Sequence, residues 1–212
     1  MKSTIRFEQS AHYHFSKTVH GQEDELWIVL HGYGQLAEYF LKKFVPFFKE
    51  NRLIVAPEAN NHSYLKGFTG RVGANWMTSH ERETAILNNH RYLNALLEFL
   101  LLRLKNNPTI KVLGFSQGAA TATRWVSQLK VPVDTLVLCS GGFAHDLTLP
   151  KSSKIFKDMK VYSINGLHDP MLTDEVKEKQ QAMIEALGIS VVSLTFDGEH
   201  ELDEASLRKI FG

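Results

Sequence analysis

Residues Lys111–Ala122 read KVLGFSQGAATA, and this stretch decides the fold. Its first half is an apolar run typical of a buried strand, and its second half is typical of a helix. Ser116 stands at the junction, with Gly114 and Gly118 on either side. Glycines weaken strands and helices alike, so their presence here indicates a function. In the G-x-S-x-G elbow they permit a sharp turn that presents the serine hydroxyl above the edge of the sheet.

Strand-like and helix-like patterns alternate along the rest of the chain. Runs rich in Val, Ile and Leu predict strands at Leu26–His31, Leu53–Pro57, Ile110–Ser116, Val133–Cys139, Val161–Asn165 and Val191–Phe196. The spacing of apolar residues predicts helices at Leu36–Phe48, Glu81–Lys105, Gln117–Leu129, Thr173–Leu187 and Leu202–Phe211. This alternation predicts an α/β fold, with a mostly parallel sheet and helices on both of its faces.

The N-terminal segment has a different pattern. Thr4–Gln9 and His12–Val19 alternate polar and apolar residues, which predicts an antiparallel hairpin at the sheet edge. The whole sheet is then expected to have about eight strands. No repeat or linker divides the chain, so residues 1–212 are expected to form a single domain. The longest stretch without a pattern, Glu58–Asn75, is expected to be a functional or mobile loop.

Composition excludes several classes of protein. Among 212 residues, 24 basic and 23 acidic side chains give a net charge of +1, which provides no field for nucleic acid. Cys139 is the only cysteine, so a disulfide framework is excluded. The first residues lack the apolar region of a secretory signal, and the apolar stretch from Leu93 is too short to span a bilayer. The sequence therefore predicts a cytoplasmic protein without a stable membrane anchor, and it gives no signal of the oligomeric state.

A serine hydroxyl of ordinary acidity is a poor nucleophile, so a base and an acid are needed beside it. In chains with this elbow, the order is serine, acid, histidine. His200 follows the last strand run, in the segment DGEH, and Asp169 follows the run Val161–Asn165. Both are expected at the carboxyl ends of strands, where the sites of α/β proteins form. Asp158 and Asp174 are the alternative acids.

The segment LHGYG, at Leu30–Gly34, is the candidate for stabilising negative charge on the substrate. A tetrahedral intermediate needs backbone N–H groups that point at its oxyanion. One comes from the residue after the nucleophile, here Gln117, and the other from the loop after the third strand, which indicates Tyr33. His31 is expected to shape this loop and not to catalyse.

The same segment also fits a dinucleotide-binding fingerprint. Gly32-Tyr33-Gly34-Gln35-Leu36-Ala37 matches G-x-G-x-x-G/A, and Glu58 lies about twenty residues further on. This Rossmann-like alternative leaves GFSQG, NGLHDP and DGEH unexplained, and its fingerprint does not follow the first strand. Another alternative is a non-catalytic binding protein of the same fold, although a binding module needs no serine elbow.

Other chemistries have little support in the sequence. His12 and His14 could share one face of a strand, but two ligands do not make a metal site. No HExxH motif and no phosphate-binding GxxxxGK motif occurs. We therefore expect neither a metal nor a cofactor.

Together, LHGYG, GFSQGAA, NGLHDPML and GEH resemble the motifs of the α/β-hydrolase superfamily. The GFSQG form in a short chain is similar to the phospholipase/carboxylesterase family, which includes acyl-protein thioesterases. The resemblance implies that carboxylic esters or thioesters are cleaved through an acyl-enzyme. It implies the nucleophile Ser116, the acid Asp169, the base His200 and the oxyanion donors Tyr33 and Gln117.

Three positions depart from the pattern of that family. Gln35 replaces an acid that often follows the HGLG segment, Ala119 replaces the second glycine of GFSQGG, and Asn165-Gly166 replaces a His-Gly turn. These changes bear on the substrate and the subfamily more than on the chemistry. Trp76 resembles a tryptophan near the substrate groove of the family.

The substrate wall must come from loops. Only about twenty residues separate the run Val133–Cys139 from the strand at Val161, too few for a helical cap domain. Phe68, Phe143 and Met171 are the apolar side chains expected to line the site. Such a wall suits a short or medium acyl chain in an open groove. The expected partner is therefore a small or acylated substrate.

Overall fold

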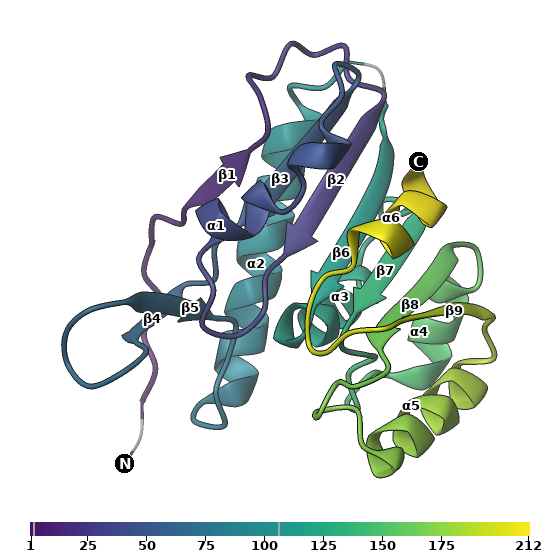
Figure 1. Ribbon diagram of the computed structural model, residues 1–212. Coiled ribbons are helices and arrows are strands. Elements are labelled where there is room, and N and C mark those ends of the chain that lie inside the picture. Colours follow the sequence, from purple (N-terminus) through teal and green to yellow (C-terminus); the bar gives the residue numbers. More distant parts are fainter. Residues whose placement is uncertain (2, 106) are drawn as a thin grey trace.

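A mostly parallel sheet lies at the centre of the molecule (Figure 1). The computed structural model describes residues 1, 3–105 and 107–212. In this described part, seven strands pair in the order β1-β3-β2-β6-β7-β8-β9. Their bounds are β1 Tyr13–Phe15, β2 Glu25–Leu30, β3 Arg52–Pro57, β6 Thr109–Phe115, β7 Thr135–Cys139, β8 Lys160–Gly166 and β9 Val191–Phe196. Every neighbouring pair is parallel except β1 and β3.

Helices cover both faces of this sheet, as the alternating pattern predicted (Figure 1). One face carries α1 (Ala37–Lys42), the 3-10 helix η1 (Val45–Phe47) and α6 (Glu204–Phe211). The other carries α2 (Arg82–Leu101), α3 (Gln117–Val126), α4 (Leu149–Phe156) and α5 (Asp174–Leu187).

The central strand β2 shows why the sheet needs both layers. Leu26, Ile28 and Leu30 are buried in the core under α2 and α3, whereas Trp27 and Val29 are buried in the core under α1 and α6. Successive side chains of a strand point to opposite faces, so a continuous apolar run requires cover on each side. Burial stabilises the fold by about 1.5–3 kcal/mol for each such side chain.

Two predicted segments differ in detail from the structure. The predicted helix Leu36–Phe48 is split, because α1 ends at Lys42 and only the short η1 follows. Pro46, within η1, has no backbone N–H and prevents a continuous α-helix there. The predicted loop Glu58–Asn75 contains an antiparallel hairpin of β4 (Asn61–Tyr64) and β5 (Val72–Asn75).

The predicted N-terminal hairpin is wrong, although the antiparallel edge exists. Thr4–Gln9 forms no strand, and β1 pairs with β3, with Tyr13 opposite Pro57 and Phe15 opposite Val55. The sheet therefore has seven described strands where about eight were expected.

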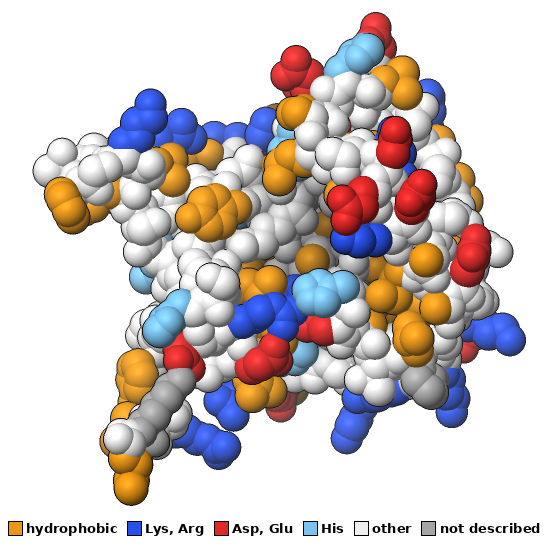
Figure 2. All heavy atoms as spheres, turned by 90° about the horizontal axis from the view of Figure 1, so that it is seen from below, with side chains coloured by type: hydrophobic (Ala, Val, Ile, Leu, Met, Phe, Trp, Pro, Cys, Tyr) orange, Lys and Arg blue, Asp and Glu red, His pale blue; other side chains and the backbone are white. Residues whose placement is uncertain are grey.

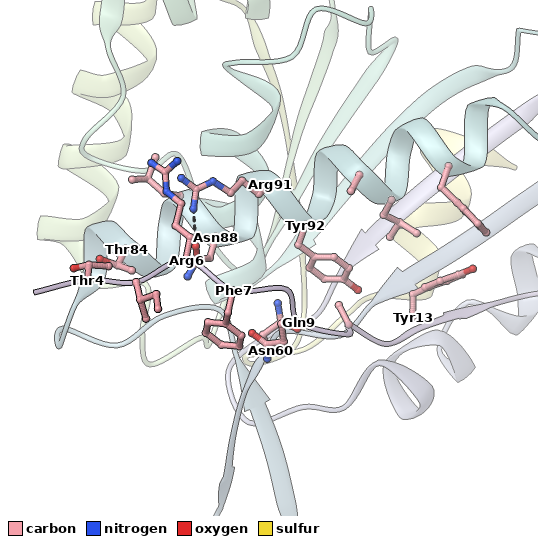
Figure 3. A pocket seen from close by; sticks show the side chains of 16 residues that line it. Thr4, Arg6, Phe7, Gln9, Tyr13, Asn60, Thr84, Asn88, Arg91 and Tyr92 are labelled. Atoms are coloured by element: carbon pink, nitrogen blue, oxygen red, sulfur yellow. Dashed lines mark hydrogen bonds between the residues drawn. The ribbon is translucent and has the colours of Figure 1, made fainter.

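The physical reason is that the alternation of polar and apolar residues in this segment marks no buried face. The side chains of Ile5 and Phe7 are 84% and 77% exposed. The segment instead runs beside α2, and Figure 3 shows Arg6 and Phe7 next to Asn88 and Arg91 of that helix. Together they line a groove of about 660 Å³.

The parallel strands all end at the same edge of the sheet, which is the lower edge in Figure 1 and the face seen in Figure 2. The loops that follow β2, β6, β8 and β9 therefore gather there. The β4–β5 hairpin projects beside this face as an arm, and the side chain of Phe68 at its turn is 93% exposed. None of the helices in the described part of the chain combines the length and apolar composition needed to cross a membrane.

Candidate active site

The turn from β6 into α3 holds Ser116 in a strained conformation. Its φ of 54° and ψ of −118° lie in a region that residues with a side chain rarely adopt. The Ser116 backbone N–H donates a hydrogen bond of 2.9 Å to the Cys139 carbonyl, at the end of the neighbouring strand β7. Strain of this kind persists only where the surroundings impose it, and it concentrates at functional sites.

Gly114 and Gly118 make the turn possible because there is no room for a side chain at either position. A Cβ on Gly114 would lie 2.4 Å from the Gly118 carbonyl oxygen, and a Cβ on Gly118 would lie 2.2 Å from the Leu30 carbonyl oxygen. The glycines therefore allow α3 to approach both β6 and β2. The G-x-S-x-G spacing follows from this close packing.

His200 and Asp169 lie beside the serine. His200 Nε2 is 2.9 Å from Ser116 Oγ, and His200 Nδ1 is 2.7 Å from Asp169 Oδ2. The Asp169 side chain is 2% exposed, and its other oxygen accepts the Met171 backbone N–H at 2.9 Å. An acceptor at Nδ1 keeps the ring proton there, so the lone pair of Nε2 faces the hydroxyl.

The two alternative acids lie elsewhere. Asp158 precedes β8 and is exposed, at the opposite edge of the sheet from Ser116. The Asp174 carboxylate is 92% exposed and pairs with Lys177 within α5. Of the three candidates, only Asp169 contacts His200.

Ser140 also contributes to this edge, and the sequence analysis missed it. Its hydroxyl donates a 3.0 Å hydrogen bond to the carbonyl of Glu201, the residue after His200. Its own φ of 45° is unusual for a residue with a side chain. The signal that could have identified it is its place directly after the predicted strand Val133–Cys139, at the same edge as the other candidates.

The loop after β2 is held by its own side chains. Ala59 donates its backbone N–H to His31 Nε2 at 3.1 Å, so this nitrogen carries no proton. The proton then lies on Nδ1, which donates to the Gly32 carbonyl at 2.7 Å. Burial lowers the pKa of His31 and favours this neutral form. The Gly32 N–H in turn donates to Gln35 Oε1 at 2.9 Å.

The two backbone amides expected to bind an oxyanion are free to do so. Within the described residues, neither the N–H of Tyr33 nor that of Gln117 has a hydrogen-bond acceptor. The Gln117 side chain is engaged elsewhere, because it accepts from the Trp76 N–H and donates to the Met77 carbonyl, both at 2.8 Å. The N–H of Gln117 also lies at the positive end of α3.

The expected substrate contacts fare differently. Trp76, expected near a substrate groove, presents no surface to a substrate, because its side chain is fully buried and its Nε1 donates to the His31 carbonyl at 2.8 Å. Phe143 is nearly buried and Met171 is exposed, and both line a cavity of about 300 Å³. Phe68 lies in the connection between β4 and β5 and is exposed.

The structure argues against a dinucleotide at Gly32–Ala37. A pyrophosphate needs free N–H groups at the helix N-terminus, but Glu58 Oε2 already accepts the Ala37 N–H at 2.9 Å. The backbone of β5 also packs on this loop, where the Gly34 N–H donates to the Ala74 carbonyl at 2.8 Å. A carboxylate and a strand thus occupy the place that a phosphate would need.

Cys139 is not a rival nucleophile. Its side chain is buried at the end of β7, and burial raises the pKa of its thiol well above the ordinary value. A thiol that stays protonated and inaccessible is unreactive.

Comparison with known proteins identifies the family of this chain. The chain matches the family model described as Phospholipase/Carboxylesterase over residues 15–211. No curated protein that was compared matches the chain significantly.

Solved structures with a similar fold include acyl-protein thioesterase 2 from Zea mays, with a TM-score of 0.72, 16% identity, and coverage of 95% of this chain and 96% of that one. A carboxylesterase from Bacillus cereus gives a TM-score of 0.66 and 16% identity over 94% and 91% of the two chains. A phospholipase/carboxylesterase from Dyadobacter fermentans gives 0.68 and 16% over 98% and 97%. At these identities the likeness shows the α/β-hydrolase fold, and the family match over nearly the whole chain shows that this protein belongs to the phospholipase/carboxylesterase family.

Proposed function

We propose that this protein is a serine hydrolase that cleaves carboxylic esters or thioesters, with Ser116, His200 and Asp169 as its catalytic triad. The observation that carries the proposal is the continuous hydrogen-bonded path from Ser116 Oγ through His200 to Asp169, with distances of 2.9 and 2.7 Å. Membership of the phospholipase/carboxylesterase family supports the same chemistry.

The reaction begins with a proton transfer. His200 Nε2 accepts the proton of Ser116 Oγ as this oxygen attacks the acyl carbon, and Asp169 stabilises the imidazolium that forms. The carbonyl oxygen becomes an oxyanion, which accepts hydrogen bonds from the Tyr33 and Gln117 amides. Loss of one such donor typically lowers kcat by about 10² to 10³.

The tetrahedral intermediate then collapses. The carbonyl re-forms, the bond to the leaving oxygen or sulfur breaks, and His200 gives its proton to the leaving group. A water molecule attacks the resulting acyl-enzyme with His200 as its base, and the carboxylic acid leaves. Ser116 regains its proton, so the cycle consumes only the ester or thioester and water.

The substrate class follows from the surroundings of the triad. The connection between β7 and β8 contains a single described helix, α4, so no large cap covers the site. Small or acylated substrates fit such a site, and the likeness to an acyl-protein thioesterase from Zea mays places thioesters within the proposal. Cys139 is a free, buried cysteine, as is common in proteins of reducing compartments, and we propose that this protein is cytoplasmic.

The decisive experiment measures turnover and covalent labelling together. The protein should hydrolyse p-nitrophenyl butyrate, and Ser116→Ala should lower kcat by at least about 10³ with an unchanged unfolding temperature. A fluorophosphonate should add to the wild-type protein and not to Ser116→Ala. The matched control is Ser190→Ala, at an exposed serine outside the site.

Two outcomes would overturn the proposal. The first is a folded wild-type protein without turnover of any ester or thioester in a panel of acyl lengths, which would favour a non-catalytic binding protein of the same fold. The second is labelling of Ser116→Ala at the wild-type rate, which would assign the nucleophile to another residue.

A further inference from the structure

The segment Gly141–Ala144, which we call the strap, follows β7 and passes directly beside the serine. A Cβ on Gly141 would lie 2.7 Å from the Ser116 carbonyl oxygen and 2.8 Å from Ala119 Cβ. The strap therefore touches the turn that carries the nucleophile. Any shift of the strap changes the space next to Ser116.

The other side of the strap borders the cavity of about 300 Å³. Its remaining lining comes from α5, from strands β8 and β9 and from the turn around Asp169 and Met171. Apolar and polar side chains share this lining, with Leu138, Leu172, Val176, Ile184 and Val191 among the apolar ones and Ser163, Lys177 and Ser193 among the polar ones. A space of this size lies at the lower end of the range for small-molecule pockets. The strap thus stands between Ser116 and this cavity.

The strap is held by the buried ring of Phe143, which packs edge-on against Phe156 with 5.4 Å between ring centroids, and by polar contacts of its backbone. Gly141 and Gly142 have wide conformational freedom, and neither forms a backbone hydrogen bond with the described residues. Gln180, from α5, binds both backbone groups of Phe143: its Oε1 accepts the N–H at 2.7 Å, and its Nε2 donates to the carbonyl at 3.1 Å. A strand partner would satisfy these groups in the same way. The next anchor is Thr123 Oγ1, which accepts the Ala144 N–H at 3.1 Å.

We propose that Gln180 determines the acyl-chain preference of the enzyme by tying the strap to α5. This inference rests on the proposed function, because it concerns the acyl group bound at Ser116. With both hydrogen bonds in place, Phe143 closes the wall and limits the length of the acyl chain. Without them, the two glycines let the strap separate from α5, and longer chains gain access to the cavity. Gln180 touches no reacting atom, so it is a positioning residue.

The test compares Gln180 with a glutamine that does not line this cavity. Gln180→Leu removes both hydrogen bonds at similar side-chain volume, and Gln180→Glu keeps the acceptor for the Phe143 N–H while losing the donor. Gln128→Leu is the matched control, because Gln128 lies outside the lining of the cavity and its amide donates a 3.2 Å hydrogen bond to Asn94 Oδ1. The kinetic readout is the ratio of kcat/KM for p-nitrophenyl octanoate to kcat/KM for the butyrate.

We expect Gln180→Leu to raise this ratio about fivefold or more, through a lower KM for octanoate, as one or two further methylenes become buried. Gln180→Glu should give an intermediate ratio, and Gln128→Leu should stay within about twofold of wild type. Unfolding temperatures identify any variant that has lost its fold, and Gln180→Glu then carries the test.

A ratio within twofold of wild type in a folded Gln180 variant would overturn the inference. So would an equal loss of activity on every ester, because it would show a purely structural role. In both cases the wild-type protein would still turn over esters, whereas a failure of the proposed function would leave the wild type inactive.

Discussion

The two ends of the strands β2 and β6 are built for different purposes. At their amino ends, Glu25 accepts hydrogen bonds from Lys111 at 3.1 Å and from the Trp27 indole at 2.9 Å. Arg52, at the start of the adjacent strand β3, completes the cluster with a contact to Glu25 and a 2.9 Å hydrogen bond to the Phe47 carbonyl. The charges of this end are paired and partly buried.

The carboxyl ends of β2, β6 and the neighbouring strand β7 show the opposite. Ser116 and Ser140 have positive φ values of 54° and 45°, and the amides of Tyr33 and Gln117 have no acceptor among the described residues. Such a backbone costs of order 1–3 kcal/mol for each strained residue. The difference teaches that the paired end and the core stabilise a fold whose other end is held strained and open for binding.

The largest effect is expected from a substitution at the carboxyl ends of the strands, which we call the open end. It leaves the amino ends, which we call the paired end, unchanged. In Asp169→Asn, the amide oxygen can still accept the Met171 N–H, so the amide NH₂ turns to His200 Nδ1. The proton of the ring then moves to Nε2, which can no longer accept the proton of Ser116. We expect kcat to fall by about 10³ to 10⁴ with an unchanged urea midpoint.

The control is Asp174→Asn, which removes an exposed carboxylate of the same type from α5 and should change kcat by less than about twofold. A large loss of kcat in Asp174→Asn, with little loss in Asp169→Asn, would show that Asp169 is not the catalytic acid.

A smaller effect is expected from Gly118→Ala, which strains the open end sterically. The new Cβ would meet the Leu30 carbonyl oxygen at 2.2 Å and the His31 carbonyl oxygen at 2.6 Å, so α3 and β2 must move apart. We expect a loss of about 3 kcal/mol in the free energy of unfolding, together with reduced activity. Urea denaturation followed by circular dichroism measures the first.

Gly188→Ala is the control, because it adds a Cβ where only the backbone conformation, and no neighbouring atom, opposes it. Gly188 has a φ of 62°, but a Cβ there would meet nothing within 4 Å. Its expected cost is about 1 kcal/mol with unchanged kcat. Equal losses in the two variants would mean that the close contact of α3 with β2 contributes nothing.

The last prediction concerns the amino ends of the strands and depends on pH, with a smaller cost than that of Gly118→Ala. Burial by itself would raise the pKa of Glu25, but the hydrogen bonds from Arg52, Lys111 and Trp27 outweigh it and lower the pKa to about 2. The carboxylate therefore stabilises the fold above its ordinary pKa of 4.5, and this contribution is lost as the pH falls through about 2. Glu25→Gln should cost about 2 kcal/mol at pH 7.

Urea midpoints of the wild type and of Glu25→Gln, measured between pH 7 and pH 3, check the sign. The difference should shrink toward acid, whereas kcat at pH 7 should not change. A difference that grows as the pH falls would contradict the depressed pKa and the role of this end in stability.

The sequence by itself determined which segments could meet at the site. Apolar runs of strand length defined the parallel sheet, and residues directly after those runs, such as Ser116, Asp169 and His200, had to lie at one edge of it. This inference needs only local pattern and chain order, because parallel strands all end on the same side. In the structure, His200 lies 2.9 Å from Ser116 Oγ and 2.7 Å from Asp169 Oδ2. The catalytic role of these three side chains stays a prediction.

The tertiary structure alone decided what depends on partners far away in the chain. From the sequence, Trp76 could face a groove or the core. It lies in the core because its indole N–H donates a hydrogen bond to the carbonyl of His31, 45 positions earlier. The pattern at Thr4–Gln9 resembled that of a strand, but this segment forms none, and the antiparallel partner of β1 is the distant strand β3. The contact of Gln180 with Phe143 joins residues 37 positions apart. No local pattern records such a pairing, because hydrogen-bond geometry and burial are set only when the layers pack together.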